Sequence, residues 1–230
     1  NKENVVKRKI ASITIALACA FGMSSCLSST ANTQNPPDVS VEKHQSYVEE
    51  TLDILNRANN IQLKKDIISW GDHWTVYADE KAVGYVNGKP LRFLEVYEFT
   101  NLDGIVIASE EENWKVVNST ANLKDWQGNQ TGRIEQEVFS MLAKLHIYRD
   151  DQKIGNIQQK LDLGINAEIT ADNNGEWKLK EKIITVGSNL TLTRLENNTE
   201  VTPLEAIWSS LILYEIISTS SGNSSSQRNK

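Results

Sequence analysis

Cysteine is nearly absent from this chain of 230 residues, and both cysteines, Cys19 and Cys26, lie near its beginning. The rest of the chain therefore cannot form an internal disulfide, and it offers no thiolate for catalysis or for a metal. The three histidines, His44, His73 and His146, show no metal-ligand spacing with one another or with a carboxylate. We expect no metal site and no other cofactor.

Positive charge is also scarce, since the formal net charge is −6. The first 25 residues carry four basic residues and one acid, so the remainder has 20 basic and 29 acidic residues, a net charge of −9. Binding to nucleic-acid phosphates needs clustered lysines and arginines. We therefore expect no nucleic-acid partner.

The local motifs of common enzymes are missing as well. The chain contains neither a Gly-x-Ser-x-Gly elbow nor a glycine-rich phosphate loop. Asp72 beside His73 could form a catalytic pair, but a solvated turn is the favoured interpretation. The three acids at 110–112 could bind a cation, but a solvated turn is again the favoured interpretation. We expect a protein that is not an enzyme.

The first 26 residues have the pattern of an export signal. A basic stretch at 7–9 precedes an apolar run at 10–22 and the sequence Met-Ser-Ser-Cys at 23–26. This pattern resembles a bacterial lipoprotein signal peptide, which implies residues 1–25 as the signal and Cys26 as the lipidated residue. Leu27 is not Asp, so the resemblance implies the outer membrane in a Gram-negative cell. An ordinary secretory peptide and a single-pass anchor are the alternatives.

The segment that follows is polar and then helical in pattern. Residues 26–40 are small, polar and interrupted by two prolines, which is typical of a flexible tether. Residues 41–60 place apolar side chains at 41, 48, 52, 55 and 58, which predicts an amphipathic helix. We expect it to pack on the outside of the folded domain; a partner-binding helix is the alternative.

Turn residues recur with a regular period through the middle of the chain. Successive markers are 24, 22, 25, 22 and 25 residues apart, and short β-branched and aromatic runs lie between them. The markers are Asp79, Asp103, Asp125, Asp150, Asp172 and Asn197. Six units of two strands each predict about twelve strands with one buried face. A β-helix of similar period is the structural alternative.

An apolar helix is predicted at 203–217, where ten of fifteen residues are apolar and fall on every side of a helical wheel. Thr202, Pro203 and Glu205 form a capping start. A helix that is apolar all round must be buried all round, and this one is too short for a bilayer. The sequence predicts a mainly β protein: an antiparallel closed barrel filled by this helix. Residues 218–230 are expected to be a disordered polar tail.

Residues 63–89, LKKDIISWGDHWTVYADEKAVGYVNGK, resemble the opening of the LURP-one-related family, within the tubby C-terminal-like and phospholipid-scramblase-like superfamily. The segments at 99–108, 147–160 and 169–183 repeat the pattern of an aromatic strand, an Asp/Gly turn and a second strand. The resemblance covers residues 61–217. It implies a twelve-stranded barrel around a hydrophobic helix, and it implies no particular activity.

Four residues are candidates for surface binding. Trp126 lies in a turn and is the tryptophan expected to be most exposed, where it could stack on a carbohydrate or lipid. Lys178, Lys180 and Lys182 alternate along one strand, on the face opposite Trp177, and are candidates for an anionic lipid. In a chain whose net charge after residue 25 is −9, an ordinary polar face is the favoured interpretation of these lysines. The other tryptophans are expected to fill the space between the barrel wall and the helix.

These observations lead to an expected function. We expect a non-enzymatic, lipid-anchored protein of the cell envelope that acts as a binding or structural module. Its partners would be the membrane, through the anchor, and a lipid or an envelope protein. A lipid-binding or lipid-handling protein of scramblase-like type is the alternative. A carrier with its ligand inside the barrel is disfavoured, because the helix would occupy the lumen.

Overall fold

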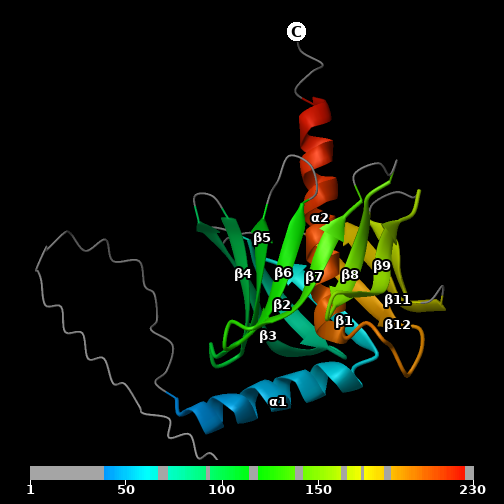
Figure 1. The fold of residues 1–230 in the computed structure, drawn as a ribbon. Helices are drawn as coiled ribbons and strands as arrows, with labels where there is room; N and C mark the ends of the chain where they lie inside the picture. The colour runs from blue at the N-terminus through cyan, green and yellow to red at the C-terminus, as the bar shows by residue number, and fades with distance from the viewer. Residues whose placement is uncertain are drawn as a thin grey trace, which may run out of the picture. The chain divides into compact units, whose positions relative to one another are not determined.

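Twelve antiparallel strands close into a barrel in the computed structural model, which confirms the predicted fold class (Figure 1). The structure describes residues 39–66, 72–91, 94–113, 119–137, 142–161, 165–171, 174–183 and 188–225. The strands are β1 (Asn60–Lys65), β2 (His73–Ala78), β3 (Lys81–Leu91), β4 (Leu94–Asn101), β5 (Val106–Asn113), β6 (Thr120–Asp125), β7 (Gln130–Gln136), β8 (Lys144–Arg149), β9 (Gln152–Gln159), β10 (Asn166–Ala171), β11 (Asn174–Ile183) and β12 (Ser188–Arg194). The predicted signal peptide, Cys26 and most of the tether lie outside the described residues.

The barrel closes where the first strand pairs with the last. Ile61 and Leu63 of β1 lie opposite Leu192 and Leu190 of β12, and all four side chains are buried. Between them, polar side chains such as Gln62 face outward. The alternation seen in the sequence therefore fixes which face of each strand lines the core.

β-Bulges explain the period of the turns. The hairpins β2–β3, β4–β5, β6–β7, β8–β9 and β10–β11 each contain a register shift, and these shifts recur every 22 to 24 residues along the chain. The turns beside two of them are pairs of acids with positive φ, Asp79–Glu80 and Asp150–Asp151. Gly104 and Gly128 supply positive φ in two others. Bulges bend and twist a strand, so this repeat helps the sheet to close.

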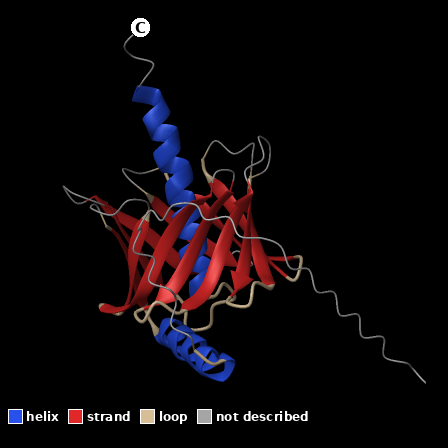
Figure 2. Cartoon of the chain, turned by 90° about the vertical axis from the view of Figure 1, so that its left-hand side faces the viewer, coloured by secondary structure: helices blue, strands red, loops and turns tan. Residues whose placement is uncertain are grey.

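The helix α2 (Pro203–Ser225) passes through the barrel and emerges at the opposite end (Figure 2). Every residue from 205 to 213 is buried, as the all-round apolar pattern predicts. The hydroxyls of Ser209 and Ser210 donate to the carbonyls of Glu205 and Ala206, both at 2.7 Å, so these buried groups are satisfied within the helix.

The predicted end of this helix was wrong. α2 continues to Ser225, eight residues beyond the predicted end at 217, so residues 218–225 are helical rather than a disordered tail. The apolar pattern marks only the part of the helix that the barrel buries, because Ser218 and Thr219 are already exposed. Backbone hydrogen bonding continues beyond the buried part. Residues 226–230 lie outside the described residues.

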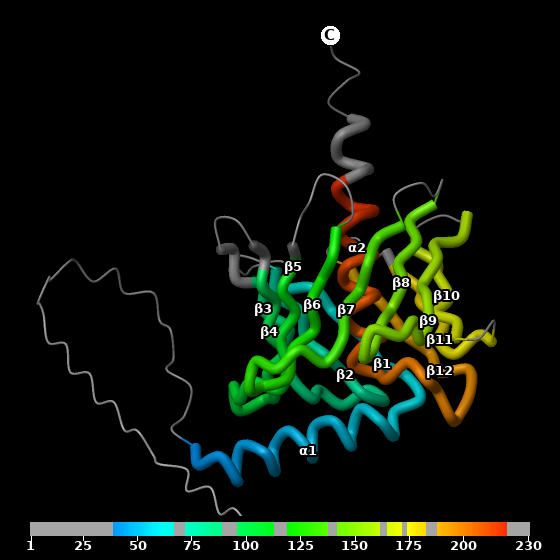
Figure 3. The backbone as a smooth tube through the Cα atoms, in the orientation of Figure 1, coloured from blue at the N-terminus to red at the C-terminus, as the bar shows by residue number. Residues whose placement is uncertain are grey.

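The helix α1 (Val41–Arg57) lies across the end of the barrel at which α2 begins (Figure 3). The hydroxyl of Ser40 caps it by accepting the backbone N–H of Lys43 at 3.4 Å. Its buried face contains Val48, Thr51 and Leu55, so the predicted external packing is confirmed. The helix ends three residues before the predicted boundary at 60, because β1 already begins at Asn60.

Large aromatic side chains fill the space between the wall and α2. Trp74, Trp177 and Trp208 are fully buried. The ring of Trp74 contacts the ring of Tyr214 edge-on, with centroids 5.0 Å apart. Trp70 and Trp114 lie outside the described residues.

Two acids face the lumen, which corrects the interpretation of 110–112 as a solvated turn. These residues lie in β5, where Glu110 and Glu112 are 1% and 4% exposed. They lie opposite Leu123 and Ala121 of β6, whose side chains also face inward. Glu111 alternates outward and forms an ion pair with Lys124.

Candidate functional site

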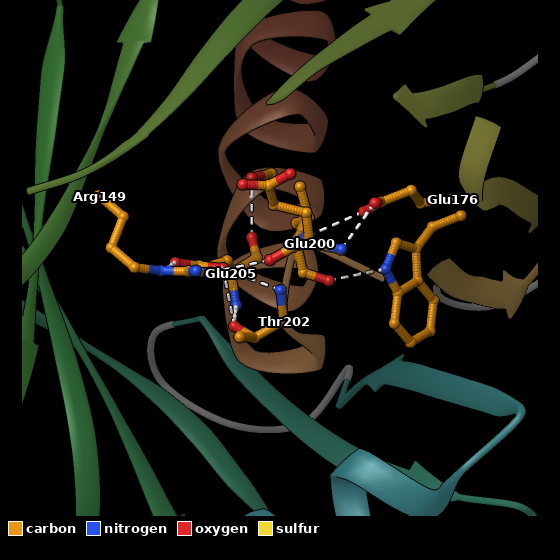
Figure 4. A network of polar contacts seen from close by, with 8 residues as sticks. Arg149, Glu176, Glu200, Thr202 and Glu205 are labelled. Atoms are coloured by element: carbon orange, nitrogen blue, oxygen red, sulfur yellow. Dashed lines mark hydrogen bonds and ion pairs between the residues drawn. The ribbon is translucent and has the colours of Figure 1, made fainter. Parts of the chain in front are cut away.

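Polar contacts concentrate at the end of the barrel where α2 begins (Figure 4). The buried carboxylate of Glu205 accepts Nε and Nη2 of Arg149 at 3.0 and 2.6 Å. The same guanidinium donates to the carbonyl of Glu200 at 2.9 Å. The hydrogen bond with Glu205 raises the pKa of Arg149 above its ordinary value, so this side chain stays charged.

The capping box predicted from Thr202 and Glu205 is present. The backbone N–H and the hydroxyl of Thr202 each donate to the Glu205 carboxylate at 2.8 Å. In return, the hydroxyl of Thr202 accepts the backbone N–H of Glu205 at 3.3 Å. Glu205 therefore both starts the helix and holds Arg149.

A second carboxylate holds the segment that leads into α2. Glu176 sits in the β10–β11 bulge, is buried, and accepts the backbone N–H groups of Glu200 and Val201 at 2.6 and 2.8 Å. The indole of Trp177 donates to the carbonyl of Val201 at 3.0 Å. The bulge turns Glu176 inward beside an inward tryptophan, which a regular strand cannot do.

A cavity of about 250 Å³ lies next to this network. Its lining comes from α1, from β5–β8 and the turns between them, and from the first turns of α2. The apolar side chains include Val48, Leu52, Ile107, Leu123, Leu204 and Trp208. Arg149, Glu205, Lys124 and Asp125 supply the charged part of the lining. An apolar cavity with a few convergent polar groups has the character of a ligand site.

Trp208, whose side chain borders the cavity, carries an unusual polar group. Its side chain is 1% exposed, and its indole Nε1–H has no hydrogen-bond partner among the residues that the structure describes. Buried donors in folded proteins nearly always have a partner. This buried donor is therefore unpaired within the described part of the fold.

Trp126 does not form the exposed platform that the sequence predicted. It is half-buried, lines the cavity, and stacks on the His44 ring of α1 with centroids 4.2 Å apart. His44 Nε2 lies 2.7 Å from the carbonyl oxygen of Val106, so this nitrogen carries the proton and donates it. Both contacts fix α1 over the cavity.

Asp125 holds the turn that carries Trp126. Partial burial works to raise its pKa, but hydrogen bonds from Asn129, Gln127 and Gly128 outweigh this effect, and the pKa lies below its ordinary value. The distances to Oδ1 are 2.9 Å from Gln127 N and 2.8 Å from Asn129 N. The carboxylate is therefore charged and already engaged by its own turn.

The three lysines lie apart from the cavity. Lys178, Lys180 and Lys182 are exposed on the outer face of β11, a strand that contributes nothing to the cavity lining. Lys178 and Lys180 lie opposite Thr193 and Thr191 of β12. The structure thus separates the predicted surface residues into one cavity residue, Trp126, and one exposed basic row.

The histidines do not form the catalytic pair considered from the sequence. His73 begins β2 rather than a turn, and its Nε2 lies 3.4 Å from a carboxylate oxygen of Asp66. Asp72 instead contacts Lys65 and accepts the hydroxyl of Tyr97 at 3.3 Å. The neighbouring residues therefore have different partners.

His146 lies on the outer face of β8. Its Nε2 is 2.9 Å from Glu137. Burial and the nearby Lys153 lower the pKa of His146 below its ordinary value, although Glu137 acts in the opposite direction.

Arg149, Glu176 and Trp208 were not singled out from the sequence. Arg149 precedes a turn and looks like an ordinary strand end, while Glu176 would face outward in a regular alternation with Trp177. For Glu205, the capping box was a usable signal. Nothing in the sequence marks Trp208 as a donor without a partner.

Comparison with known protein families and with curated proteins found no match. Within the described ranges, no three His, Cys, Asp or Glu side chains gather as a metal site. In the same part of the chain, no helix combines the length and apolarity needed to cross a bilayer.

Proposed function

We propose that the protein is a non-enzymatic, lipid-anchored module of the bacterial cell envelope that binds its partner at the α1 end of the barrel. Cys26 carries the lipid, and the outer membrane is the destination in a Gram-negative cell. The observation that supports binding at this end is the 250 Å³ cavity between α1, the strand ends and α2. Because α2 occupies the lumen, a ligand site has to lie outside it.

The position of α1 in the sequence connects this site to the anchor. α1 begins at Val41, and residues 27–40 separate it from Cys26. Fourteen residues span at most about 50 Å when fully extended. A lipid at Cys26 would therefore hold the start of α1 within about 50 Å of the membrane surface, where a lipid or an envelope protein is within reach.

Metabolic labelling in a bacterial host tests the anchor. An alkyne-tagged fatty acid should label the wild-type chain, and the chain should sediment with membranes. Cys26→Ser should abolish both, because lipidation requires this thiol. Cys19→Ser is the matched control and should change neither. Continued labelling of the Cys26→Ser chain would refute the proposed anchor.

Site-specific photocrosslinking tests the binding end. A photoreactive phenylalanine replaces Trp126 at the cavity, and in a control chain it replaces Leu161, which is highly exposed on another part of the barrel. In intact envelopes, position 126 should give a discrete product that position 161 does not. Identical patterns from the two positions would contradict binding at the α1 end.

A second candidate function is lipid handling of scramblase-like type, supported by the row of exposed lysines. Lys178, Lys180 and Lys182 form no ion pair with another described residue, so their charges are available to anionic headgroups. Vesicles with fluorescent anionic lipid test this function. Redistribution or extraction of lipid, lost when all three lysines become Gln, would favour lipid handling over a purely binding role.

A further inference from the structure

The outer faces of three neighbouring strands carry positive charge with no acid between them. In the closed barrel, β12 lies between β11 and β1. Their outward side chains pair across the strands in three rows, Lys178–Thr193–Asn60, Lys180–Thr191–Gln62 and Lys182–Asn189–Lys64. These nine residues are named the lysine face: four are lysines, five are neutral polar residues and none is an acid.

The four lysines of this face are exposed. None of them forms an ion pair with another residue that the structure describes. On the other side of β11, Glu168 of β10 lies opposite Lys178, but its carboxylate is paired with Lys160. The ammonium group of Lys64 lies 4.1 Å from the centre of the Tyr77 ring, which does not neutralise its charge. In a chain with a net charge of −6, this concentration of positive charge favours an anionic partner.

The geometry of the sheet sets the spacing of these charges. Alternate residues of a strand lie about 6.6 Å apart, and neighbouring strands lie about 4.8 Å apart. Lys178, Lys180 and Lys182 therefore form a line about 13 Å long, and Lys64 stands two strands, or about 10 Å, from Lys182. A small anion can contact only one or two of these ammonium groups. An extended polymer with repeated negative charges can follow the whole line.

The neutral residues of the face indicate the kind of polymer. The hydroxyl of Thr191 and the amides of Gln62 and Asn189 stand beside the lysines, and such groups both donate to and accept from sugar hydroxyls. None of the nine residues has a large apolar side chain. Proteins that bind a membrane surface add apolar side chains that enter it. A hydrophilic polymer therefore fits this face better than a bilayer does.

We propose that the lysine face binds an extended acidic glycan, a chain of sugars that carries carboxylate groups. The carboxylates contact Lys178, Lys180 and Lys182, and the sugar hydroxyls contact the neutral residues. The inference goes beyond the proposed function, since none of the three strands lines the cavity under α1. It also gives the lysines a partner other than anionic headgroups. Because each exposed ion pair is weak, affinity depends on several contacts made at once.

Three probes separate the contributions. Oligogalacturonate has sugars with carboxylates, its methyl ester has the same sugars without the charges, and oligoglutamate of equal charge has carboxylates without sugars. Titration calorimetry measures binding to the full chain in nanodiscs of zwitterionic lipid, corrected with empty nanodiscs. Oligogalacturonate should bind about tenfold more tightly than its ester, and less tightly as salt is raised. It should bind about threefold or more tightly than oligoglutamate, because the neutral residues add hydrogen bonds.

A triple variant tests the lysines themselves. Lys178→Gln, Lys180→Gln and Lys182→Gln, combined in one chain, should weaken oligogalacturonate binding about tenfold, because three exposed ion pairs are lost. Replacing the same three lysines by Arg keeps the charges and should restore binding. The matched control combines Lys43→Gln, Lys81→Gln and Lys153→Gln.

The control removes the same charge from exposed lysines outside the lysine face, and its affinity should stay within about twofold of wild type. Thermal unfolding verifies that every variant is folded. Absence of oligogalacturonate binding, or equal losses in the two Gln variants, would overturn the site. Equal affinity for oligoglutamate would overturn the choice of a glycan. Vesicles of phosphatidylglycerol that sediment the nanodiscs only when the β11 lysines are present would identify a membrane partner and overturn it as well.

Discussion

Arg149 and Glu205 face each other across the α1 end of the barrel and form a two-point ion pair, with Nε–Oε1 and Nη2–Oε2 distances of 3.0 and 2.6 Å. Arg149 is the last residue of β8, and Glu205 lies in the first turn of α2. The pair therefore connects the wall of the barrel to the helix that fills it, and it borders the cavity under α1.

Arg149→Met should lower the free energy of unfolding by about 1.5–3 kcal/mol, because it leaves the buried Glu205 carboxylate without its charged donor. The matched control is Arg133→Met, which removes outer-face pairs with Glu135 and with the highly exposed Asp151 and should cost about 1 kcal/mol or less. Chemical denaturation measures both. Equal costs would contradict the structural importance of the Arg149–Glu205 pair.

Glu176→Gln should destabilise the segment that leads into α2, because an amide replaces one of the two oxygens that accept the N–H groups of Glu200 and Val201. We expect a loss of about 1–3 kcal/mol, the cost of a buried donor without a partner. Glu200→Gln, at an exposed side chain, is the control and should be neutral. Hydrogen exchange at the amide of Val201 gives a local readout, and protection unchanged by Glu176→Gln would refute this role.

The pH dependence should contain a contribution from His146. Its pKa is lowered from an ordinary value of 6.5, so the unfolded chain binds this proton more readily than the folded chain. The contribution of His146 to the free energy of unfolding is therefore fully present above about pH 6.5, and it is lost as the pH falls toward and through the lowered pKa. His146→Gln should remove that part of the decrease. The pKa of Glu137 is also lowered, mainly by Lys144, but from 4.5, so its contribution appears at lower pH. An unchanged profile between pH 5 and 6.5 in His146→Gln would contradict the prediction.

Gly155→Ala should destabilise the barrel where β9 approaches the segment before α2. A Cβ at this position would lie 2.7 Å from Val201 Cγ2 and 2.8 Å from the backbone oxygen of Thr170. Backbone cannot move as easily as a side-chain tip, so we expect a cost of about 1–3 kcal/mol. Gly175→Ala is the comparison, because its closest obstacle is the end of the flexible Glu168 side chain. A larger loss of thermal stability from Gly175→Ala would reverse the expected order.

The architecture could be predicted because its signals repeat. Five hairpins each have a register shift close to their turn, so Asp and Gly recur with a nearly fixed period, and a helix that is apolar all round has to be buried all round. The alternation of single strands is a weaker signal, since a bulge changes which side chains point inward. Glu176 is turned inward by such a bulge. Glu110 and Glu112 of β5 face the lumen of the barrel.

The candidate site could be predicted only in small part. The capping box of Thr202 and Glu205 is local and therefore visible in the sequence. The cavity joins α1 to strand ends and to α2, segments that are more than 150 residues apart in the chain at their extremes, such as Val48 and Trp208. Trp126 was expected to be exposed because its turn is polar, but its ring stacks on His44 of α1 and packs against the core.

α2 fills the lumen of the barrel, so a binding site has to lie outside the lumen. Leu211 is buried inside the barrel, whereas Ser218 is exposed on the same helix. The direct test compares the equilibrium unfolding of two variants, Leu211→Asp and Ser218→Asp, measured by denaturant titration. We predict that Leu211→Asp has no cooperative unfolding transition, because a buried charge there has no partner, and that Ser218→Asp stays within about 0.5 kcal/mol of wild type. A cooperative transition for Leu211→Asp at the same midpoint as Ser218→Asp would contradict the account.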